Sequence, residues 1–187
     1  MNRIRVRIFP VLLVFALSGP AWGSAVQVEA RAGYFFPSSS GFRDVYRGGL
    51  AFGLDLSVPV WRSLWPWTGV GIFNRTGKLT FTQEPTTLRV MPLFAGVKLQ
   101  SVSAAVRPYL AVAAGEFFYK ETNVIGTASG RKFGLVAQLG LLVRVKGRVF
   151  LDIHGRYTTC KPTFDGAEPV TSQLGGIQGG LGLSVRI

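Results

Sequence analysis

The sequence predicts an all-β fold: an eight-stranded antiparallel up-and-down transmembrane β-barrel, preceded by a cleavable signal peptide. Three observations predict it. The chain begins with a basic and then apolar segment, eight later segments alternate apolar and polar residues, and the links between them alternate in length. A charged fraction of only 16% and a total of 24 glycines are typical of a chain in apolar surroundings.

Residues 1–25 have the pattern of an export signal. Arg3, Arg5 and Arg7 precede the apolar run 8–17, and small residues then suit cleavage before Ser24 or Val26. The apolar run is shorter than the ~20 residues that a membrane-spanning helix needs, and no later stretch reaches that length. We therefore expect a signal peptide over 1–25 and an outer-membrane β-barrel domain over 26–187, which must cross any membrane with strands.

The remainder of the chain alternates with a period of two, which directs successive side chains to opposite faces of a strand. In the last segment, Leu183 and Val185 share one face, and Ser184 and Arg186 share the other. The predicted strands are residues 26–36, 50–58, 65–77, 86–100, 105–119, 132–146, 148–158 and 177–187.

The middle segments alternate less cleanly. In 86–100 we assign Leu93 and Val97 to the apolar face and Lys98 to the opposite face. In 105–119 the predicted apolar face consists of Tyr109, Ala111, Ala113, Phe117 and Tyr119, with Glu116 opposite. The register of 65–77 stays open, because a bulge shifts every following side chain by one position.

Strand number and link length also favour a membrane barrel. The total of eight is even, as in bacterial single-chain barrels, and about 9–11 residues suffice for a tilted strand to cross a bilayer. Links 59–64, 101–104 and 146–147 are short, whereas 37–46, 78–85, 120–130 and 161–171 are longer. Short turns on one side and long loops on the outer side are the pattern of outer-membrane barrels.

Alternation does not say which face is outside, because a soluble lipid carrier has the same fold with an apolar lumen. The polar face is rich in glycine and in opposite charges, which suits a narrow filled lumen. The predicted luminal charge network consists of Glu29, Arg31, Asp55, Lys98, Glu116, Arg144, Asp152, His154, Arg156 and Arg186.

Aromatic residues gather near the segment ends, as in the interfacial girdles of membrane barrels. The predicted girdle consists of Tyr34, Phe36, Trp61, Trp65, Trp67, Phe117, Tyr119 and Tyr157. The competing interpretation is that these rings fill a soluble core.

Several stretches carry a family resemblance. Residues 33–37 (GYFFP), 93–99, 107–110 (RPYL) and the glycine-rich closing strand resemble the OmpA/OmpX-like family of small outer-membrane β-barrels. The resemblance covers 26–187 as a loose pattern. It implies insertion by the barrel-assembly machinery, although family members commonly end on Phe and this chain ends on Ile187.

His154 is the one histidine and lies between Asp152 and Arg156 on the predicted inner face. An Asp–His pair can orient a general base, so a lipid A acyl hydrolase-like enzyme using His154 is the alternative function. Hydrolases of that kind resemble this chain in size and use a His-x-Ser arrangement on the lipid side, whereas here the sequence reads His154-Gly155-Arg156. One histidine and one cysteine, Cys160, predict no metal site and no cofactor.

The net charge of +12 is spread along the chain, which does not favour nucleic-acid binding. Basic residues of the predicted outer loops can pair with lipopolysaccharide phosphates or form an ordinary solvated rim. They are Arg43, Arg47, Arg75, Lys78, Lys120, Arg131, Lys132 and Lys161. We expect a monomeric, non-enzymatic outer-membrane protein without an open pore, with a structural role or a role in surface contact through its outer loops.

Overall fold

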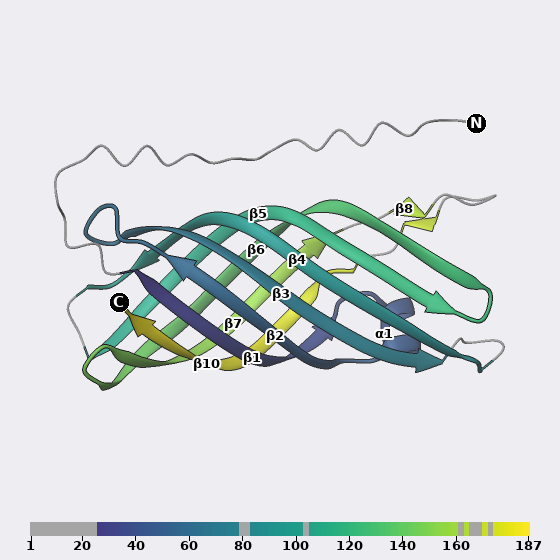
Figure 1. The fold of residues 1–187 in the computed structure, drawn as a ribbon, viewed down its shortest axis with the longest axis horizontal. Coiled ribbons are helices and arrows are strands. Elements are labelled where there is room, and N and C mark those ends of the chain that lie inside the picture. Colours follow the sequence, from purple (N-terminus) through teal and green to yellow (C-terminus); the bar gives the residue numbers. More distant parts are fainter. Residues whose placement is uncertain (1–25, 79–82, 103–104, 161–162, 165–169, 172–173) are drawn as a thin grey trace.

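The computed structural model describes residues 26–78, 83–102, 105–160, 163–164, 170–171 and 174–187. Eight strands close into one antiparallel barrel in the order β1-β10-β7-β6-β5-β4-β3-β2 (Figure 1). They are β1 (Gln27–Pro37), β2 (Gly49–Ser57), β3 (Leu64–Lys78), β4 (Pro85–Gln100), β5 (Val106–Asn123), β6 (Gly126–Lys146), β7 (Val149–Cys160) and β10 (Gly176–Arg186). The predicted eight-stranded antiparallel barrel is confirmed, whereas the predicted signal peptide over 1–25 lies outside the described residues.

Closure depends on the first and last barrel strands. β1 pairs with β10 along its whole length, from Gln27 opposite Arg186 to Pro37 opposite Gly176, and with β2 on its other edge. No strand edge of the barrel is therefore left open, which lipid demands because it offers no hydrogen-bond partners to the backbone.

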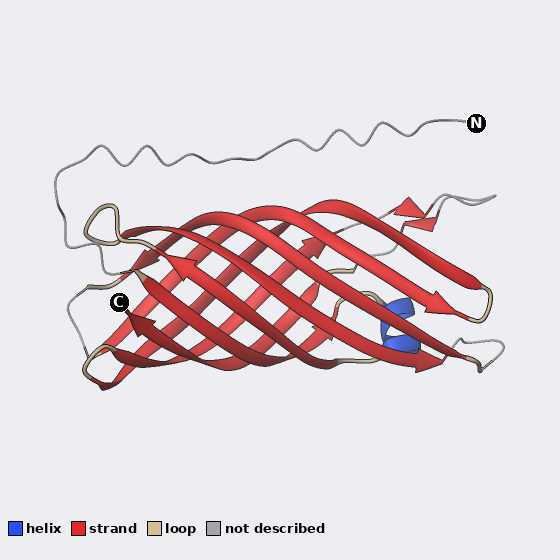
Figure 2. Cartoon of the chain, viewed as in Figure 1, coloured by secondary structure: helices blue, strands red, loops and turns tan. Residues whose placement is uncertain are grey.

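The two ends of the barrel differ. The short turns β2–β3, β4–β5 and β6–β7 lie at one end together with the C-terminus, and helix α1 (Ser40–Tyr46) lies at the other (Figures 1 and 2). The second end also has the small sheet of β8 (Thr163–Phe164) and β9 (Val170–Thr171). By analogy with other barrels, we treat the α1 end as outer and the short-turn end as periplasmic.

The faces are those of a membrane barrel. Leu54, Leu139 and Leu181 expose more than half of their surface on the outer wall, whereas Asp152 and Lys98 are fully buried in the lumen. A continuous apolar belt around the wall with charges inside is the reverse of a soluble carrier. Within the described residues, no helix has the length and apolar character to span a membrane.

The inner face of β5 corrects one assignment. Tyr109, Ala111, Ala113 and Phe117, which we assigned to the lipid face, are buried in the lumen, and Leu110 faces outward. Both faces of this strand are apolar, so alternation alone did not distinguish them. In β3 the open register is settled, with Trp65, Trp67 and Phe73 facing inward.

Two outer links contain more structure than predicted. Residues 40–46 form α1 instead of an irregular loop, and its Phe42 and Tyr46 are buried in the outer mouth. The predicted link 120–130 is mostly strand, because β5 and β6 stay paired up to Asn123 opposite Gly126. The long link 161–171 lies partly outside the described residues.

Candidate functional site

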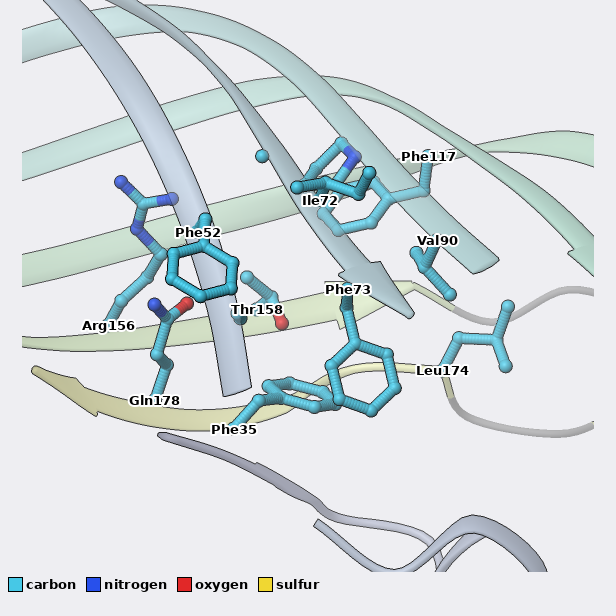
Figure 3. A pocket seen from close by; sticks show the side chains of 13 residues that line it. Phe35, Phe52, Ile72, Phe73, Val90, Phe117, Arg156, Thr158, Leu174 and Gln178 are labelled. Atoms are coloured by element: carbon cyan, nitrogen blue, oxygen red, sulfur yellow. The ribbon is translucent and has the colours of Figure 1, made fainter. Parts of the chain in front are cut away.

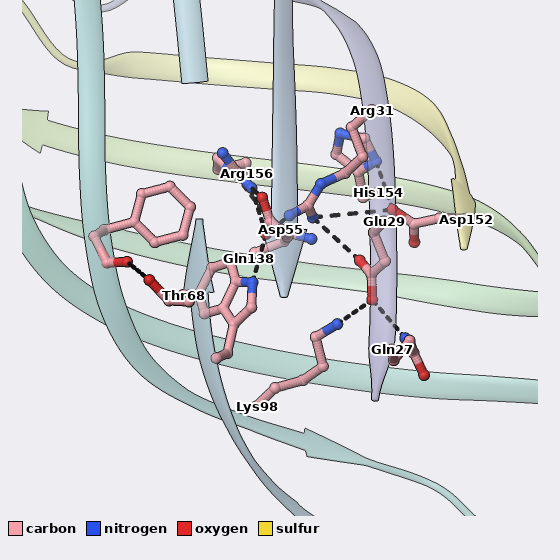
Figure 4. A network of polar contacts seen from close by, with 12 residues as sticks. Gln27, Glu29, Arg31, Asp55, Thr68, Lys98, Gln138, Asp152, His154 and Arg156 are labelled. Carbon is pink, nitrogen blue, oxygen red and sulfur yellow. Dashed lines mark hydrogen bonds and ion pairs between the residues drawn. The ribbon is translucent and has the colours of Figure 1, made fainter. Parts of the chain in front are cut away.

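A polar network fills the middle of the lumen (Figure 4). Three carboxylates, Glu29, Asp55 and Asp152, face three cations, Arg31, Lys98 and Arg156. All six residues are nearly or fully buried. Buried charges are stable only when they are paired and hydrogen-bonded, and equal numbers of the two signs meet that requirement.

Arg31 and Glu29 on β1 are at the centre of this network. Arg31 forms an ion pair with Asp55 on β2 and lies 3.8 Å from Glu29 and 4.0 Å from Asp152 (Nη1 to carboxylate oxygen). Glu29 accepts a short charged hydrogen bond from Lys98 on β4. The network therefore joins strands on opposite sides of the lumen.

Neutral side chains complete the connections. Arg156 Nε donates to Gln138 Oε1 at 2.8 Å, and Gln138 Nε2 donates to the Tyr109 hydroxyl at 2.6 Å. Tyr109 donates to Asp152 Oδ1 at 2.8 Å, and Trp67 Nε1 donates to a carboxylate oxygen on β2. With Arg186 Nε donating to Gln27 Oε1 at 3.0 Å, all eight barrel strands contribute.

The four neutral partners, Gln27, Trp67, Tyr109 and Gln138, were not among the predicted network residues. Gln27 and Gln138 each lie between apolar residues of an alternating strand, and this signal could have identified them. Trp67 and Tyr109 gave no such signal, because an aromatic residue in an alternating strand suits lipid and lumen equally well.

Two predicted network residues lie elsewhere, and a third, Arg186, reaches the network only at its edge, through Gln27. Glu116 is largely exposed and forms a 3.4 Å ion pair with Arg131 near the outer rim. Arg144 and Arg186 belong to the periplasmic mouth, beside Phe150. His154 lies within the network, with Nδ1 2.9 Å from Asp152 Oδ2, and its side chain is fully buried.

The predicted aromatic girdle separates into two sets. Tyr34, Phe36, Trp61 and Tyr157 are exposed on the outside of the barrel or in a turn. The remaining four face inward, so their predicted position in the girdle is incorrect: they are Trp65, Trp67, Phe117 and Tyr119.

Luminal glycines explain how inward rings fit in a narrow barrel. A methyl group added to Gly134 would lie 2.7 Å from the Phe117 ring, and one added to Gly140 would lie 2.6 Å from the Tyr109 hydroxyl oxygen. The glycines on the polar face have no side chain, and neighbouring aromatic side chains pack into the space that this leaves. Sequence alternation shows both residue types, but not that they belong to the same face.

An apolar pocket of about 50 Å³ lies in the outer half of the lumen (Figure 3). Phe35, Phe73, Val90 and Leu174 line it from inside, and Pro92 reaches it from the barrel wall. The β3–β4 ladder lacks the residue pairs of Pro92 itself and of its neighbour Met91, because Pro92 has no N–H to donate. The volume is sufficient for a few water-sized groups, and the lining suits the end of a short alkyl chain.

Helix α1 covers the outer mouth above this pocket. Phe42 packs edge-on against Phe35, with ring centroids 6.5 Å apart, and the Tyr46 hydroxyl lies 3.0 Å from Thr86 Oγ1. Burial raises the pKa of Tyr46 above its ordinary value, so the phenol keeps its proton. The helix is thus attached to the barrel by apolar contact and a neutral hydrogen bond.

The predicted outer basic residues are differently engaged. Arg43 Nη1 donates to the backbone oxygens of Pro37 and Ser38, and Arg75 Nε donates to the backbone oxygen of Tyr46. Arg131 is in the ion pair with Glu116 described above. The remaining described ones, Arg47, Lys78, Lys120 and Lys132, are exposed, and Lys161 lies outside the described residues.

A further outward-facing arginine, Arg89, was not predicted. Arg89 on β4 stands directly opposite Lys120 on β5, and both side chains are exposed. The sequence neighbours of Arg89 are buried, and those of Lys120 are half-buried. Arg131 on β6 is opposite Phe118, two residues from Lys120 on the same face. We call Arg89, Lys120 and Arg131 the outer basic patch.

No metal centre is evident: within the part of the chain that the structure describes, no three His, Cys, Asp or Glu side chains are grouped to hold an ion. Asp152 and His154 are adjacent, but their neighbours are arginines and a tyrosine, which repel a cation or offer it no carboxylate.

Comparison with known proteins finds solved structures that resemble this chain, but no matching sequence family. No protein-family model matches the chain, and no curated protein matches it. The crystal structure of Neisserial surface protein A is similar with a TM-score of 0.62 and 16% identity, over 90% of this chain and 100% of that one.

Two further similar structures have the same architecture. The N-terminal β-barrel domain of Pseudomonas aeruginosa OprF has a TM-score of 0.56 and 10% identity, over 87% of this chain and 98% of its own. Ail, the attachment invasion locus protein of Yersinia pestis, was solved with the heparin analogue sucrose octasulfate. It has a TM-score of 0.53 and 15% identity, over 88% of this chain and 97% of its own. The closed ladder, the apolar outer wall and these likenesses together show that this chain has the fold of the small, integral, eight-stranded β-barrels of the bacterial outer membrane.

Proposed function

We propose that this protein is a non-enzymatic, non-conducting barrel that stabilises the outer membrane by binding lipopolysaccharide phosphates on its outer wall, while presenting its outer loops to surface partners. The single observation that carries the proposal is the outer basic patch.

The outer basic patch holds unbalanced charge. Like charges directly opposite each other on paired strands are destabilising, and Arg89 and Lys120 stand in that relation. Neither forms an ion pair with another described residue, and the nearby carboxylate of Glu116 is engaged by Arg131. An external anion between the two side chains would turn this repulsion into two charge-assisted hydrogen bonds.

The position of the patch suits a lipid-borne phosphate. Its side chains point away from the lumen, on strands whose next outward residues toward the membrane include Phe118 and Leu93. A phosphate bound there would be at the boundary between apolar wall and water, where the outer leaflet carries its phosphorylated headgroups. Ail, which shares the fold, was solved with a sulfated polyanion, and this supports polyanion binding on such a scaffold.

The lipid-hydrolase alternative is not favoured by the geometry. The His154 side chain is fully buried in the lumen and faces Asp152, so an acyl chain in the surrounding lipid cannot reach it. Its neighbours are charged partners of the network, which is the arrangement of a structural histidine. Replacing it, as His154→Ala, should leave a structural protein working and an enzyme inactive.

The lumen is filled rather than open. Trp67, Phe94 and Phe150 are each about 2% exposed, and the charge network lies among them. Eight strands enclose room for side chains and little else. Planar bilayers containing the protein should therefore show no steady open channels, and a stable conductance would overturn the non-conducting assignment.

The lipopolysaccharide contact is tested by stability in nanodiscs. The thermal midpoint at which the compact gel form is lost is measured with lipopolysaccharide and with the same lipopolysaccharide after removal of its phosphates. Two charge-assisted contacts of about 1.5 kcal/mol each correspond to a midpoint higher by several degrees, at about 2–4 °C per kcal/mol. Arg89→Gln with Lys120→Gln should abolish this difference.

The matched control removes two charges from the other end. Arg62→Gln with Arg148→Gln alters exposed residues of the short turns and should keep the full phosphate-dependent increment. If the patch variant keeps the increment as well, the proposed contact is refuted.

A further inference from the structure

We infer that the periplasmic mouth of the barrel contains a second anion site, built by Arg107, Arg144 and Arg186 on a floor of two aromatic rings, which binds a phosphate group. This site is at the opposite end of the barrel from the outer basic patch and does not depend on it. The charge balance of the lumen, the stacking of the guanidinium groups and an unsatisfied donor carry the inference.

The three arginines converge on one ring. The guanidinium carbons of Arg107, Arg144 and Arg186 lie 4.8, 5.6 and 5.1 Å from the centroid of Phe150. Arg186 also lies 4.8 Å from the Trp65 centroid. They come from three different strands, β5, β6 and β10, whose ends meet at the short-turn side of the barrel.

Positive charge is in excess at this mouth. In the mid-lumen network, three carboxylates already match three cations, so none of them is left over for the mouth. Arg144 and Arg186 form no ion pair with any described residue. Arg144 acts as a like charge on Arg107 and on Arg186, and Arg107 acts as a like charge on Arg186. Aromatic faces offset part of the repulsion, but a bound anion would remove it.

The donor geometry is held in place before any ligand arrives. Arg186 Nε is fixed by Gln27 Oε1 at 3.0 Å, and its Nη2 is buried with no hydrogen-bond partner among the described residues. A buried donor without a partner is costly, so Nη2 is set to donate to a ligand. Stacking on a buried ring reduces the rotamer freedom that binding would otherwise remove from a long side chain.

Ligand chemistry follows from the donor set. Three guanidinium forks offer more donors than the two oxygens of a carboxylate can accept, whereas a phosphate presents up to four oxygens and more charge. The phosphate group can belong to a phospholipid of the periplasmic leaflet or to a soluble periplasmic compound. Both sources supply the same chemistry, and the experiment distinguishes them.

The test is titration of the folded protein in a phosphate-free maltoside detergent with inorganic phosphate, followed by the NMR signals of the arginine Nε–H groups. The Arg186 signal should shift and saturate. Arg144→Gln should weaken apparent binding about tenfold, corresponding to the roughly 1.4 kcal/mol expected for one lost charged contact. Arg144 is exposed, so this variant should fold, and the unboiled gel band verifies it.

Arg62→Gln is the matched control, because it removes one exposed charge at the same end but outside the cluster, and should leave the titration unchanged. Repetition in nanodiscs of phosphatidylglycerol separates the sources. Loss of the phosphate-induced shift there identifies the lipid headgroup as the occupant, and its persistence identifies a soluble phosphate. A shift that never saturates, or one that is equal in the Arg144→Gln variant, overturns the inference.

Discussion

Removing Lys98 should destabilise the barrel far more than removing an exposed partner of the same charge. Lys98 and Glu29 are both fully buried and form an ion pair, and Lys98 Nζ also lies 4.8 Å from the centroid of the Tyr109 ring. In Lys98→Met, Glu29 would keep only Gln27 and the more distant Arg31, at 3.8 Å. An uncompensated buried charge costs about 3–5 kcal/mol, and this is the expected loss in the free energy of unfolding.

The control is the exposed ion pair. The Arg131 and Glu116 side chains are 60% and 46% exposed, so Arg131→Met should cost about 0–1 kcal/mol. Both variants remove one cation from a β-strand and differ mainly in burial. Adding Glu29→Gln to Lys98→Met should recover most of the loss, because the stranded charge disappears with its partner.

The assay is urea unfolding in detergent, followed by gel mobility without boiling and by the fluorescence of the buried tryptophans, with linear extrapolation to water. The folded form should migrate compactly and the unfolded form slowly. If Lys98→Met loses less than about 1 kcal/mol, or if the double variant is less stable than the single one, the network does not act as paired charge.

Three further predictions concern packing and the outer helix. Gly140→Ala should cost about 1–3 kcal/mol, because the added methyl group would displace both Tyr109 and the backbone oxygen of Ile153. Gly155→Ala on the neighbouring strand, where an added methyl group meets nothing within 4 Å, should be nearly neutral, and equal urea midpoints for the two variants would contradict this. Trp67→Phe should lose about 1–3 kcal/mol, because it leaves Asp55 without the indole donor, and a wild-type unfolding curve would count against the hydrogen bond. Tyr46→Phe should increase hydrogen exchange in α1 without loosening the barrel. Burial raises the pKa of Tyr46, so the part of the ultraviolet titration that is lost in Tyr46→Phe should lie at higher pH than the titration of free tyrosine, and a loss at the pH of free tyrosine would show that the helix does not bury this phenol.

The strands that were predicted best were those with one clearly polar face. β7 and β10 place charged, glycine and serine residues opposite aliphatic ones, and a period of two suffices to orient them. β5 was assigned the wrong face because Leu110 and Ala111 are equally apolar, and only the closed barrel shows which of them faces lipid. Alternation in the sequence orients a strand only when its two faces differ in polarity, and it cannot orient a strand such as β5 whose two faces are both apolar.

The remaining differences have the same origin. The outer parts of β5 and β6 contain Thr127, Ser129 and similar polar residues, which resemble a loop because this part of the ladder lies beyond the apolar belt. The mid-lumen charges could be selected from the sequence, but not the role of Tyr109 or Trp67 among them. Arg89 was not selected because its partner, Lys120, lies 31 positions away and only strand register places them together.

The luminal ion pairs and hydrogen bonds connect parts of the chain that are synthesised far apart. Arg156 binds Asp55 across 101 positions, and Arg186 reaches Gln27 across 159. Until β7 is present, Asp55 lacks Arg156, and until β10 pairs with both β1 and β7, each of those strands has an open backbone edge that cannot enter hydrocarbon without a large cost. Insertion should therefore be a late, all-or-none event that follows release of the whole polypeptide, and a chain truncated before Gly176 should remain a substrate for periplasmic proteases instead of forming a smaller barrel.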